Sequence, residues 1–403
     1  MLNTPYVKKD TIKNFFPVPN AVFDLGLHHM EINIYAYLLR IEDRRTYQCL
    51  VSYPTIARKL GISVNTVAKY VAALEEHGLI RTERTEIITR DGLKRNGCLR
   101  YTILPIKNAL ALCYERQMEK AIKWYTDKGI HILKTGYAGA FPDGHSHHGQ
   151  YGVNHYQKVV ETAARYRMTL DAHEPIKDTG IRRTWPNMMT REGARGMEWN
   201  AWSEGNPPSH HEMLPFTRLL GGPMDYTPGT FDILFTQTKD SPKRQKWNDQ
   251  DKGNSRVNTT LAKQLANWVI LYSPLQMASD MIEHYKGHPA FRFFRDFDPD
   301  CDESRALAGE PGEFVAVVRK AKQNYFLGAS TNEEPRVLPV SLDFLEKGKT
   351  YKAIIYADGE KADWKTNPTE YQITEQEVTA DDTLNIRMAA GGGQAISFMP
   401  LQK

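Results

Sequence analysis

Residues 52–78, SYPTIARKLGISVNTVAKYVAALEEHG, decide the fold of the first quarter of this chain. Ser52 is a helix N-cap candidate, and Gly61 ends the short helix that follows it. Ser63 caps a second helix, which runs to about His77. Two helices joined by a short turn that contains a glycine are typical of the helix-turn-helix arrangement.

The sequence around this motif extends it into a winged domain. A further helix is predicted over residues 30–41, and strands over 86–88 and 99–103 enclose a turn. The start of the second helix and the hairpin offer polar side chains to DNA bases and phosphates, namely Ser63, Asn65, Thr66, Lys69, Arg90, Lys94 and Arg95. A three-helix packing unit with a solvated basic hairpin is the plain alternative. We favour binding of duplex DNA, because this segment resembles the winged helix-turn-helix domains of bacterial replication-initiator and regulatory proteins.

The distribution of charge supports a separate task for this first quarter. The chain has 52 Lys and Arg, 48 Asp and Glu, and a formal net charge of +4. Residues 1–110 hold 16 Lys and Arg against 10 Asp and Glu, so the remaining residues hold 36 against 38. The whole basic excess therefore lies in the first quarter, which is typical of a nucleic-acid-facing module joined to a different kind of domain.

Length and composition bound the rest of the chain. With 403 residues, 41% hydrophobic and 25% charged, it is globular and long enough for two or three domains. No apolar run approaches the ~20 residues of a membrane span, and the N-terminus leads into no apolar signal core. The four cysteines show no CxxC spacing. We therefore expect a cytoplasmic protein with no membrane partner.

After residue 113 the pattern changes to strand, helix, strand. Strands predicted at 130–134 and 168–172 flank a helix over 153–166, and polar residues follow each strand. In a (β/α)8 barrel the chemistry lies at the carboxyl ends of the strands. From about residue 313, short β segments separated by turn residues predict a small antiparallel domain. The predicted fold is an α+β winged helix-turn-helix domain over residues 1–112, a partial (β/α)8 barrel over 113–312, and a C-terminal β-sandwich domain over 313–403.

Three carboxylates in the central part are candidates for chemistry: Glu174, Glu192 and Glu198. Converging carboxylates supply the acid and base of a glycosidase, and they equally supply the oxygen ligands of a calcium site. Spacing alone leaves a plainer interpretation open, because Glu192 and Arg195 also have the spacing of a helix-surface ion pair.

The short motifs around these carboxylates carry a closer resemblance. In chain order they are GYAG (136–139), HGQ (148–150), DAHEP (171–175), RTWPN (183–187), ARGME (194–198), PFTR (215–218), GGPMDYTPG (221–229), YSPLQMA (272–278), IYAD (355–358) and AAGGG (389–393). This run, over about residues 113–403, resembles glycoside hydrolase family 97, the calcium-dependent α-glucosidases and α-galactosidases. The resemblance implies an α-glucoside oligosaccharide as the substrate.

The resemblance also implies roles for individual residues. Glu198 matches the family's general acid, and Glu174 matches a carboxylate that holds calcium and helps the base to activate water. Glu192 matches a further calcium ligand, Glu198 lies at the same ion, and His173 matches a substrate contact. A bound cation orients carboxylates and shifts their pKa values, so that one donates a proton while another accepts one.

A stereochemical outcome is implied as well. The family's retaining α-galactosidases have an Asp nucleophile where this chain has Gly136, so the segment is similar to the inverting α-glucosidase branch. His145, His147 and His148 are zinc-type donors. The family has a His-rich loop there without zinc, and we expect none.

The chain departs from the family's pattern in its first part. The family's signal peptide, N-terminal β-sandwich and first barrel half are not matched, and the position of its other catalytic base falls near Ile106. A full barrel needs about 250 residues, whereas residues 113–312 suit about four βα units. Because a half-barrel has open sheet edges, we expect a tendency to self-associate.

Three functions follow from these observations. The first is an α-glucosidase segment behind a DNA-binding domain, with doubtful activity because one base and half of the barrel are missing. The second is a DNA-binding replication or regulatory protein whose enzyme-derived remainder is inert. The third is a non-catalytic sugar binder that uses Trp185, Trp199 and His173.

Overall fold

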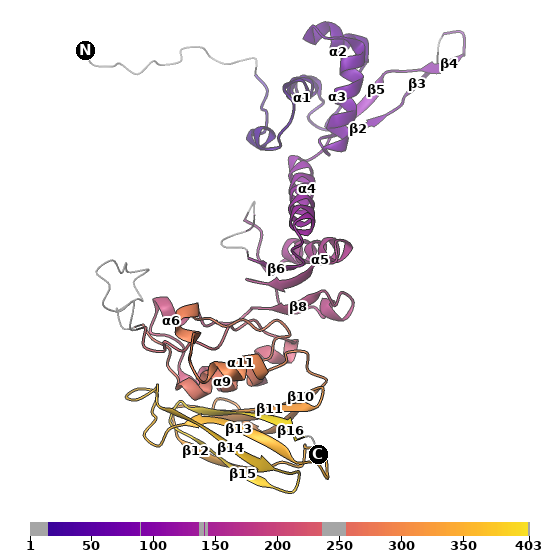
Figure 1. Ribbon diagram of the computed structural model, residues 1–403. Coiled ribbons are helices and arrows are strands. Elements are labelled where there is room, and N and C mark those ends of the chain that lie inside the picture. Colours follow the sequence, from indigo (N-terminus) through magenta and orange to yellow (C-terminus); the bar gives the residue numbers. More distant parts are fainter. Residues whose placement is uncertain (1–14, 89, 137–140, 142–143, 236–254, 402–403) are drawn as a thin grey trace, which may run out of the picture. The chain divides into compact units, whose positions relative to one another are not determined.

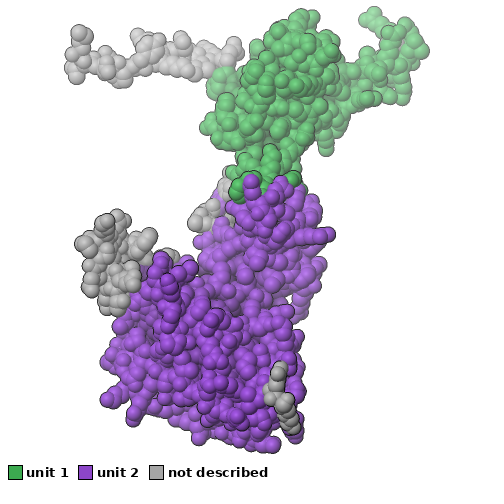
Figure 2. All heavy atoms as spheres, viewed as in Figure 1, with its two compact units in different colours: residues 1–124 green, residues 125–403 purple. Residues whose placement is uncertain are grey.

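The computed structural model describes residues 15–88, 90–136, 141, 144–235 and 255–401 (Figure 1). The chain forms two compact units, residues 1–124 and residues 125–403 (Figure 2). The division falls inside one continuous helix, α4 (Ile106–Asp127). No helix of the described ranges is both long enough and apolar enough to cross a bilayer.

The first unit is the predicted winged helix-turn-helix domain. Its helices are η1 (Asn20–Asp24), α1 (His29–Ile41), α2 (Tyr53–Leu60) and α3 (Val64–Glu76). A sheet in the order β1-β5-β2 is formed by β1 (Gln48–Val51), β5 (Leu99–Ile103) and β2 (Ile80–Glu83). The strands β3 (Glu86–Ile88) and β4 (Lys94–Asn96) pair antiparallel and form the wing.

The helix caps predicted from the sequence are confirmed. The Ser52 hydroxyl accepts a hydrogen bond from the Thr55 N–H (3.3 Å), and the Ser63 hydroxyl accepts one from the Thr66 N–H (3.1 Å). Gly61 ends α2 with φ +67°, a conformation that glycine adopts without strain. Between the helices and the sheet lies a core of fully buried apolar side chains, among them Ile34, Leu38, Ile56, Val67, Leu74 and Tyr101.

The second unit begins with a parallel sheet of three strands. Its order is β6 (Ile132–Thr135), β7 (Thr169–Ala172) and β8 (Met188–Arg191), and α5 (Gln150–Arg165) connects the first two. A parallel bridge from Arg191 to Met224 extends this sheet by a fourth position. These elements form the central α/β region that the sequence predicts as part of a (β/α)8 barrel.

Short helices and one long buried helix follow this sheet. They are η3 (Ile181–Arg183), α6 (Trp199–Trp202), α7 (Pro208–Met213), η4 (Leu214–Phe216), η5 (Arg218–Gly221), α9 (Leu261–Ile270), α10 (Ile282–Tyr285) and α11 (Phe291–Asp296). All ten residues of α9 are buried, and α9 packs on β11 and β16 of the C-terminal sheet (Figure 1). The helix therefore joins the α/β region to the C-terminal domain through a shared core.

The C-terminal domain is antiparallel, as predicted. Six strands in the order β14-β13-β16-β11-β10-β9 form its main sheet, and a smaller sheet pairs β12 with β15. The bounds are β9 (Glu303–Glu310), β10 (Phe314–Ala321), β11 (Asn324–Thr331), β12 (Arg336–Ser341), β13 (Tyr351–Asp358), β14 (Tyr371–Val378), β15 (Thr383–Met388) and β16 (Gly393–Pro400). The two sheets enclose a second core, which includes Leu327, Ile386 and Phe398.

The first domain bound of the sequence analysis falls inside a helix, and the second falls in the turn between β9 and β10. Residue 112 lies inside α4, which begins directly after Pro105 and buries Ala109 in the core of the first unit. The main sheet begins before residue 313, because β9 already pairs with β10 from Glu303 onward. The sequence pattern does not predict β9, since its side chains are mostly exposed and carry no clear apolar alternation.

Candidate functional site

The candidate site lies at the carboxyl ends of the parallel strands. The N–H of His173 donates to the Thr135 carbonyl (2.7 Å), and the N–H of Glu192 donates to the Ala172 carbonyl (2.9 Å). The N–H of Asp225 donates in the same way to the Arg191 carbonyl (3.0 Å). Each of these residues therefore continues the ladder one step beyond its strand, so their side chains emerge at one edge of the sheet.

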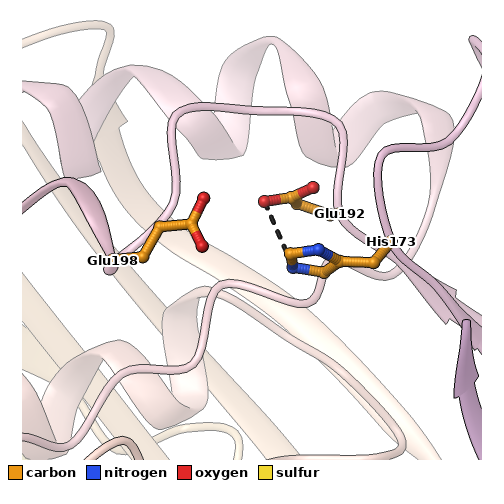
Figure 3. A group of neighbouring side chains, drawn as sticks. All are labelled: His173, Glu192 and Glu198. Atoms are coloured by element: carbon orange, nitrogen blue, oxygen red, sulfur yellow. Dashed lines mark ion pairs between the residues drawn. The ribbon is translucent and has the colours of Figure 1, made fainter. Parts of the chain in front are cut away.

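Three side chains converge at this edge. His173, Glu192 and Glu198 each offer a ligand atom, and these atoms lie within 4.8 Å of one another (Figure 3). The His173 Nε2 atom is 3.2 Å from Glu192 Oε1. Glu192 is buried, His173 is partly buried, and Glu198 is exposed. The predicted candidates Glu192, Glu198 and His173 are thus brought together.

Burial and mutual repulsion set the protonation of this group. Burial raises the pKa of Glu192, although a hydrogen bond from the Glu174 N–H opposes the shift. Burial also raises the pKa of Glu198, and the charge of Glu192 adds to that shift. The pKa of His173 is lowered by burial and by the charge of Lys134. The site therefore combines carboxyl groups that hold protons more tightly than usual with a histidine that is neutral at pH 7.

Glu174 contributes its backbone to this cluster, while its carboxylate lies outside the group of converging ligand atoms. Its N–H donates to Glu192 Oε2 (2.9 Å), and its carbonyl accepts hydrogen bonds from the Tyr156 hydroxyl and the His147 ring. Glu174 has φ +47°, a strained conformation for a residue with a side chain. These bonds hold the strained turn in place, and the exposed side chain remains at the rim.

Next to the cluster lies an ion-paired group, formed by Lys134, Asp171 and Asp225, that the sequence analysis missed. Lys134 Nζ is 2.6 Å from Asp225 Oδ2 and 3.8 Å from Asp171 Oδ2, and both carboxylates are almost fully buried. Burial, with the charge of Asp225, raises the pKa of Asp171 to about 8. The sequence feature that could have indicated this group is a charged residue inside each predicted strand, Lys134 and Asp171, together with Asp225 of the GGPMDYTPG motif.

A buried network fixes the loop that carries Glu198, and this was missed too. The Asn206 side chain donates to the Gly196 carbonyl and to the Tyr226 hydroxyl, both at 2.9 Å. Its N–H donates to the Asn200 side chain (2.9 Å), which in turn donates to the Met197 carbonyl (2.9 Å). Because these bonds anchor both sides of Glu198, the carboxylate is directed by a rigid loop.

The donor chemistry of the site fits a calcium ion in part. Glu192 and Glu198 each offer one converging carboxylate oxygen, whereas calcium takes six to eight oxygen ligands. The remaining ligands would come from Glu174 at the rim, from water or from a bound sugar. Among the described residues, these three side chains are the group of metal-ligand type that lies close enough to share one ion.

Three further residues named in the sequence analysis, Gly136, Trp185 and Trp199, lie in different surroundings. A Cβ at Gly136 would lie 3.8 Å from the Cβ of His173, so this position faces the site and bears no carboxylate. Trp185 lines a separate cavity of about 290 Å³ with Arg191 and Tyr156. Trp199 lies under the Arg195 guanidinium at 4.5 Å. Neither Trp199 nor His173 is among the residues that line this cavity.

In the first unit, the predicted DNA-facing residues divide into two groups. Ser63 and Thr66 are engaged with each other at the start of α3, with 2.8 Å between their hydroxyls. Asn65 and Lys69 are exposed, and Lys69 Nζ lies 5.1 Å from the ring of Tyr70. The helix therefore presents Asn65 and Lys69 freely, while Ser63 and Thr66 mainly cap it.

The wing carries the other basic residues. Arg90, Lys94 and Arg95 are exposed on the β3–β4 hairpin, and Lys94 pairs with Glu86 at 3.1 Å. Such an exposed ion pair contributes little to stability. Arg90 and Arg95 remain available to a polyanion.

Comparison with known families matches three stretches of the chain. Residues 94–194 match the family model described as "Glycoside hydrolase 97", and residues 300–399 match "Glycosyl-hydrolase 97 C-terminal, oligomerisation". Residues 25–80 match the model of a "Helix-turn-helix domain". The predicted resemblances of the two parts of the chain are thereby confirmed.

Individual relatives agree with these matches. A "Retaining alpha-galactosidase" of Bacteroides thetaiotaomicron is 28% identical over 288 residues, covering 71% of this chain and 41% of the relative. A solved structure of a glycoside hydrolase family 97 enzyme from Pseudoalteromonas sp. strain K8, in complex with acarbose, is 42% identical with a TM-score of 0.65. It covers 72% of this chain, and another structure of that enzyme, in complex with panose, has a TM-score of 0.66. The chain spans less than half of the length of these relatives, at 41% and 45%.

Proposed function

We propose that the second unit carries a calcium-dependent, inverting α-glucosidase site, joined to a DNA-binding domain. The observation that supports this most is the convergence of Glu192, Glu198 and His173 at the carboxyl ends of parallel strands. A pair of carboxyl groups is what hydrolysis of a glycosidic bond requires.

Each residue then has a role that follows from its environment. The raised pKa of Glu198 favours its protonated form, which would donate the proton to the glycosidic oxygen. Glu174 at the rim helps to activate the attacking water, and neutral His173 hydrogen-bonds a sugar hydroxyl. Glu174, Glu192 and Glu198 would hold the calcium ion, which supplies a fixed positive charge that orients the carboxylates.

The choice of an inverting α-glucosidase rests on two further points. Gly136 has no side chain that could act as the nucleophile of a retaining enzyme. The relative at 42% identity is described in complex with panose, an oligosaccharide of α-linked glucose, whereas the retaining α-galactosidases are 28% and 29% identical. An α-glucoside oligosaccharide is therefore the substrate that we propose.

Activity of this chain alone should be low. The position of the second base falls near Ile106, an apolar residue that packs against the core of the first unit. With p-nitrophenyl α-glucoside and calcium, we expect turnover at least ~100-fold below that of an enzyme with both bases. Glu198→Gln should remove the remaining turnover, whereas Glu204→Gln, an exposed neighbour, should not. Turnover comparable to that of an intact enzyme would show that the missing base is not needed.

We also propose that the first unit binds duplex DNA. If the glycosidase-like second unit is inert, DNA binding is the chain's only activity. The support is the exposed set of Asn65, Lys69, Arg90 and Arg95 on a helix-turn-helix and its wing. Such contacts to phosphates make affinity depend strongly on salt.

This proposal is tested by the affinity of the whole chain for duplex DNA across a salt series, measured by fluorescence anisotropy. Lys69→Ala and Arg95→Ala should each weaken binding and each reduce the slope of log affinity against log salt by about 1. Lys107→Ala, an exposed lysine of α4, serves as the control and should change neither. No binding at low salt, or equal losses in all three variants, would exclude this surface.

We propose self-association as a further property of the second unit. Among the described residues β6 pairs on one side only, and Ile132 on it is 56% exposed. An open strand edge with an exposed apolar side chain favours pairing with another chain. The name of the matched C-terminal family model points in the same direction.

A further inference from the structure

Arg218 in η5 holds the backbone that carries Glu192. Its Nε donates to the Glu192 carbonyl at 2.7 Å, and its Nη2 donates to the Arg191 carbonyl at 2.6 Å. These are the last residue of β8 and the residue whose carboxylate enters the site. The guanidinium therefore fixes the main chain at the point from which Glu192 emerges.

The same guanidinium also holds the neighbouring segment of the sheet. Its Nη1 donates to the Gly222 carbonyl and its Nη2 to the Pro223 carbonyl, both at 3.2 Å. Met224 follows directly and forms the parallel bridge to Arg191. Asp225 comes next and forms the ion pair with Lys134. One side chain thus ties together the two backbone segments that carry Glu192 and Asp225.

Arg218 is held by backbone carbonyls and not by a carboxylate. Within the described parts of the chain, no carboxylate lies at ion-pair distance from it, and its hydrogen bonds all go to backbone carbonyls. Burial and the charge of Arg191 lower its pKa to about 10, so it still carries its charge at pH 7. Arg218 is partly buried, and withdrawing a cation from water without an anionic partner is costly. The planar fork that reaches four carbonyls compensates for that cost, and a lysine cannot reproduce it.

Gly193 lies next to this fork. Its φ of +83° lies in the left-handed region, and a Cβ there would be 3.4 Å from Arg218 Nε and 3.1 Å from Arg191 Nη1. A side chain at this position would strain the backbone and crowd Arg191, whereas its contact with Arg218 would be an ordinary one. Gly193 therefore suits the backbone conformation directly after Glu192.

We propose that Arg218 is a positioning residue that sets the geometry of the cation-binding carboxylates through the backbone of Glu192. This rests on the proposed calcium site. Glu192 accepts the Glu174 N–H on one oxygen and faces His173 with the other, so a shift of its backbone moves all three groups. Partners that orient ligands in this way typically change metal affinity 10- to 100-fold when they are lost.

The test compares Arg218→Lys with a matched control, Arg319→Lys, in the whole chain. Arg319 is also a partly buried arginine that donates to two carbonyls, those of Val269 (2.6 Å) and Ile270 (3.4 Å), but it lies outside the site. The affinity for calcium is measured by calorimetry, and the melting temperature is measured alongside. Hydrogen exchange of the Glu174 amide reports on its bond to Glu192 and does not require calcium.

We expect Arg218→Lys to weaken calcium binding at least ~10-fold and to speed exchange of the Glu174 amide, with a loss of melting temperature similar to that of the control. Arg319→Lys should leave both site readouts within about twofold. Unchanged affinity and exchange in a folded Arg218→Lys variant would overturn the proposal. If the unaltered chain binds no calcium, the proposed function fails on its own, and the amide exchange alone decides the role of Arg218.

Discussion

Replacing Lys263 by Met should lower the free energy of unfolding by ~3–5 kcal/mol. The ammonium of Lys263 is fully buried and lies 2.7 Å from Glu212 Oε1. It also donates to the carbonyls of Pro208 (3.0 Å) and Thr331 (2.8 Å). Without it, the equally buried Glu212 must either keep an unpaired charge or take up a proton, and both are costly.

Urea unfolding of the second unit within the whole chain measures this loss. The double variant Lys263→Met/Glu212→Leu should regain much of the stability, because it removes both charges. Lys352→Met breaks an ion pair of similar length, 2.5 Å to Glu375, in which both side chains are about 40% exposed. This control should cost less than ~1 kcal/mol. An equally small loss for Lys263→Met would contradict the interpretation.

The location of this pair explains why its loss should affect the whole unit. Glu212 lies in α7 and Lys263 in α9, while Ser330 of β11 donates to both oxygens of Glu212 at 2.9 Å. One buried polar group therefore connects the α/β region to the C-terminal sheet. Such a group is stabilising only when every member is satisfied, as it is here.

Local features of the chain were predictable from the sequence. The caps at Ser52 and Ser63 and the stop at Gly61 involve residues within a few positions of each other, so the sequence pattern determines them. Among the candidate site residues, His173 and Glu192 follow strands that align in parallel, and their convergence follows from that topology.

Features that depend on distant residues were not predictable. Lys134 and Asp225 are 91 positions apart and meet only because the sheet brings their strands into register. Arg218 acts on Glu192 from 26 positions away. The N–H of Glu174, in a turn with positive φ, donates to Glu192, which is 18 positions away. In each case the decisive partner lies on another element.

Replacing Glu192 by Gln should lower the affinity for calcium by ~10- to 100-fold. Calcium affinity depends on the number of charged oxygen ligands, and this change removes one charge from the most buried of them. The amide oxygen can still accept the Glu174 N–H, so the turn should persist. Affinity should also decrease as the pH falls, because a ligand must lose its proton and burial raises the pKa of Glu192 and Glu198.

The control for this prediction is Glu161→Gln. Glu161 lies on α5 and accepts a hydrogen bond from Gln157 (2.8 Å), apart from the group of converging ligand atoms. Its replacement removes the same charge from the same unit. It should therefore leave calcium affinity unchanged and isolate the local effect from that of net charge.

The most direct test of a cation-dependent glycosidase site is a calorimetric titration of the whole chain with calcium, carried out for the unaltered protein, Glu192→Gln, Glu198→Gln and Glu161→Gln. We predict one bound ion per chain, lost or weakened at least ~10-fold in the Glu192 and Glu198 variants and retained in Glu161→Gln. No binding to the folded unaltered chain, or equal binding to all four proteins, would contradict the assignment of this site.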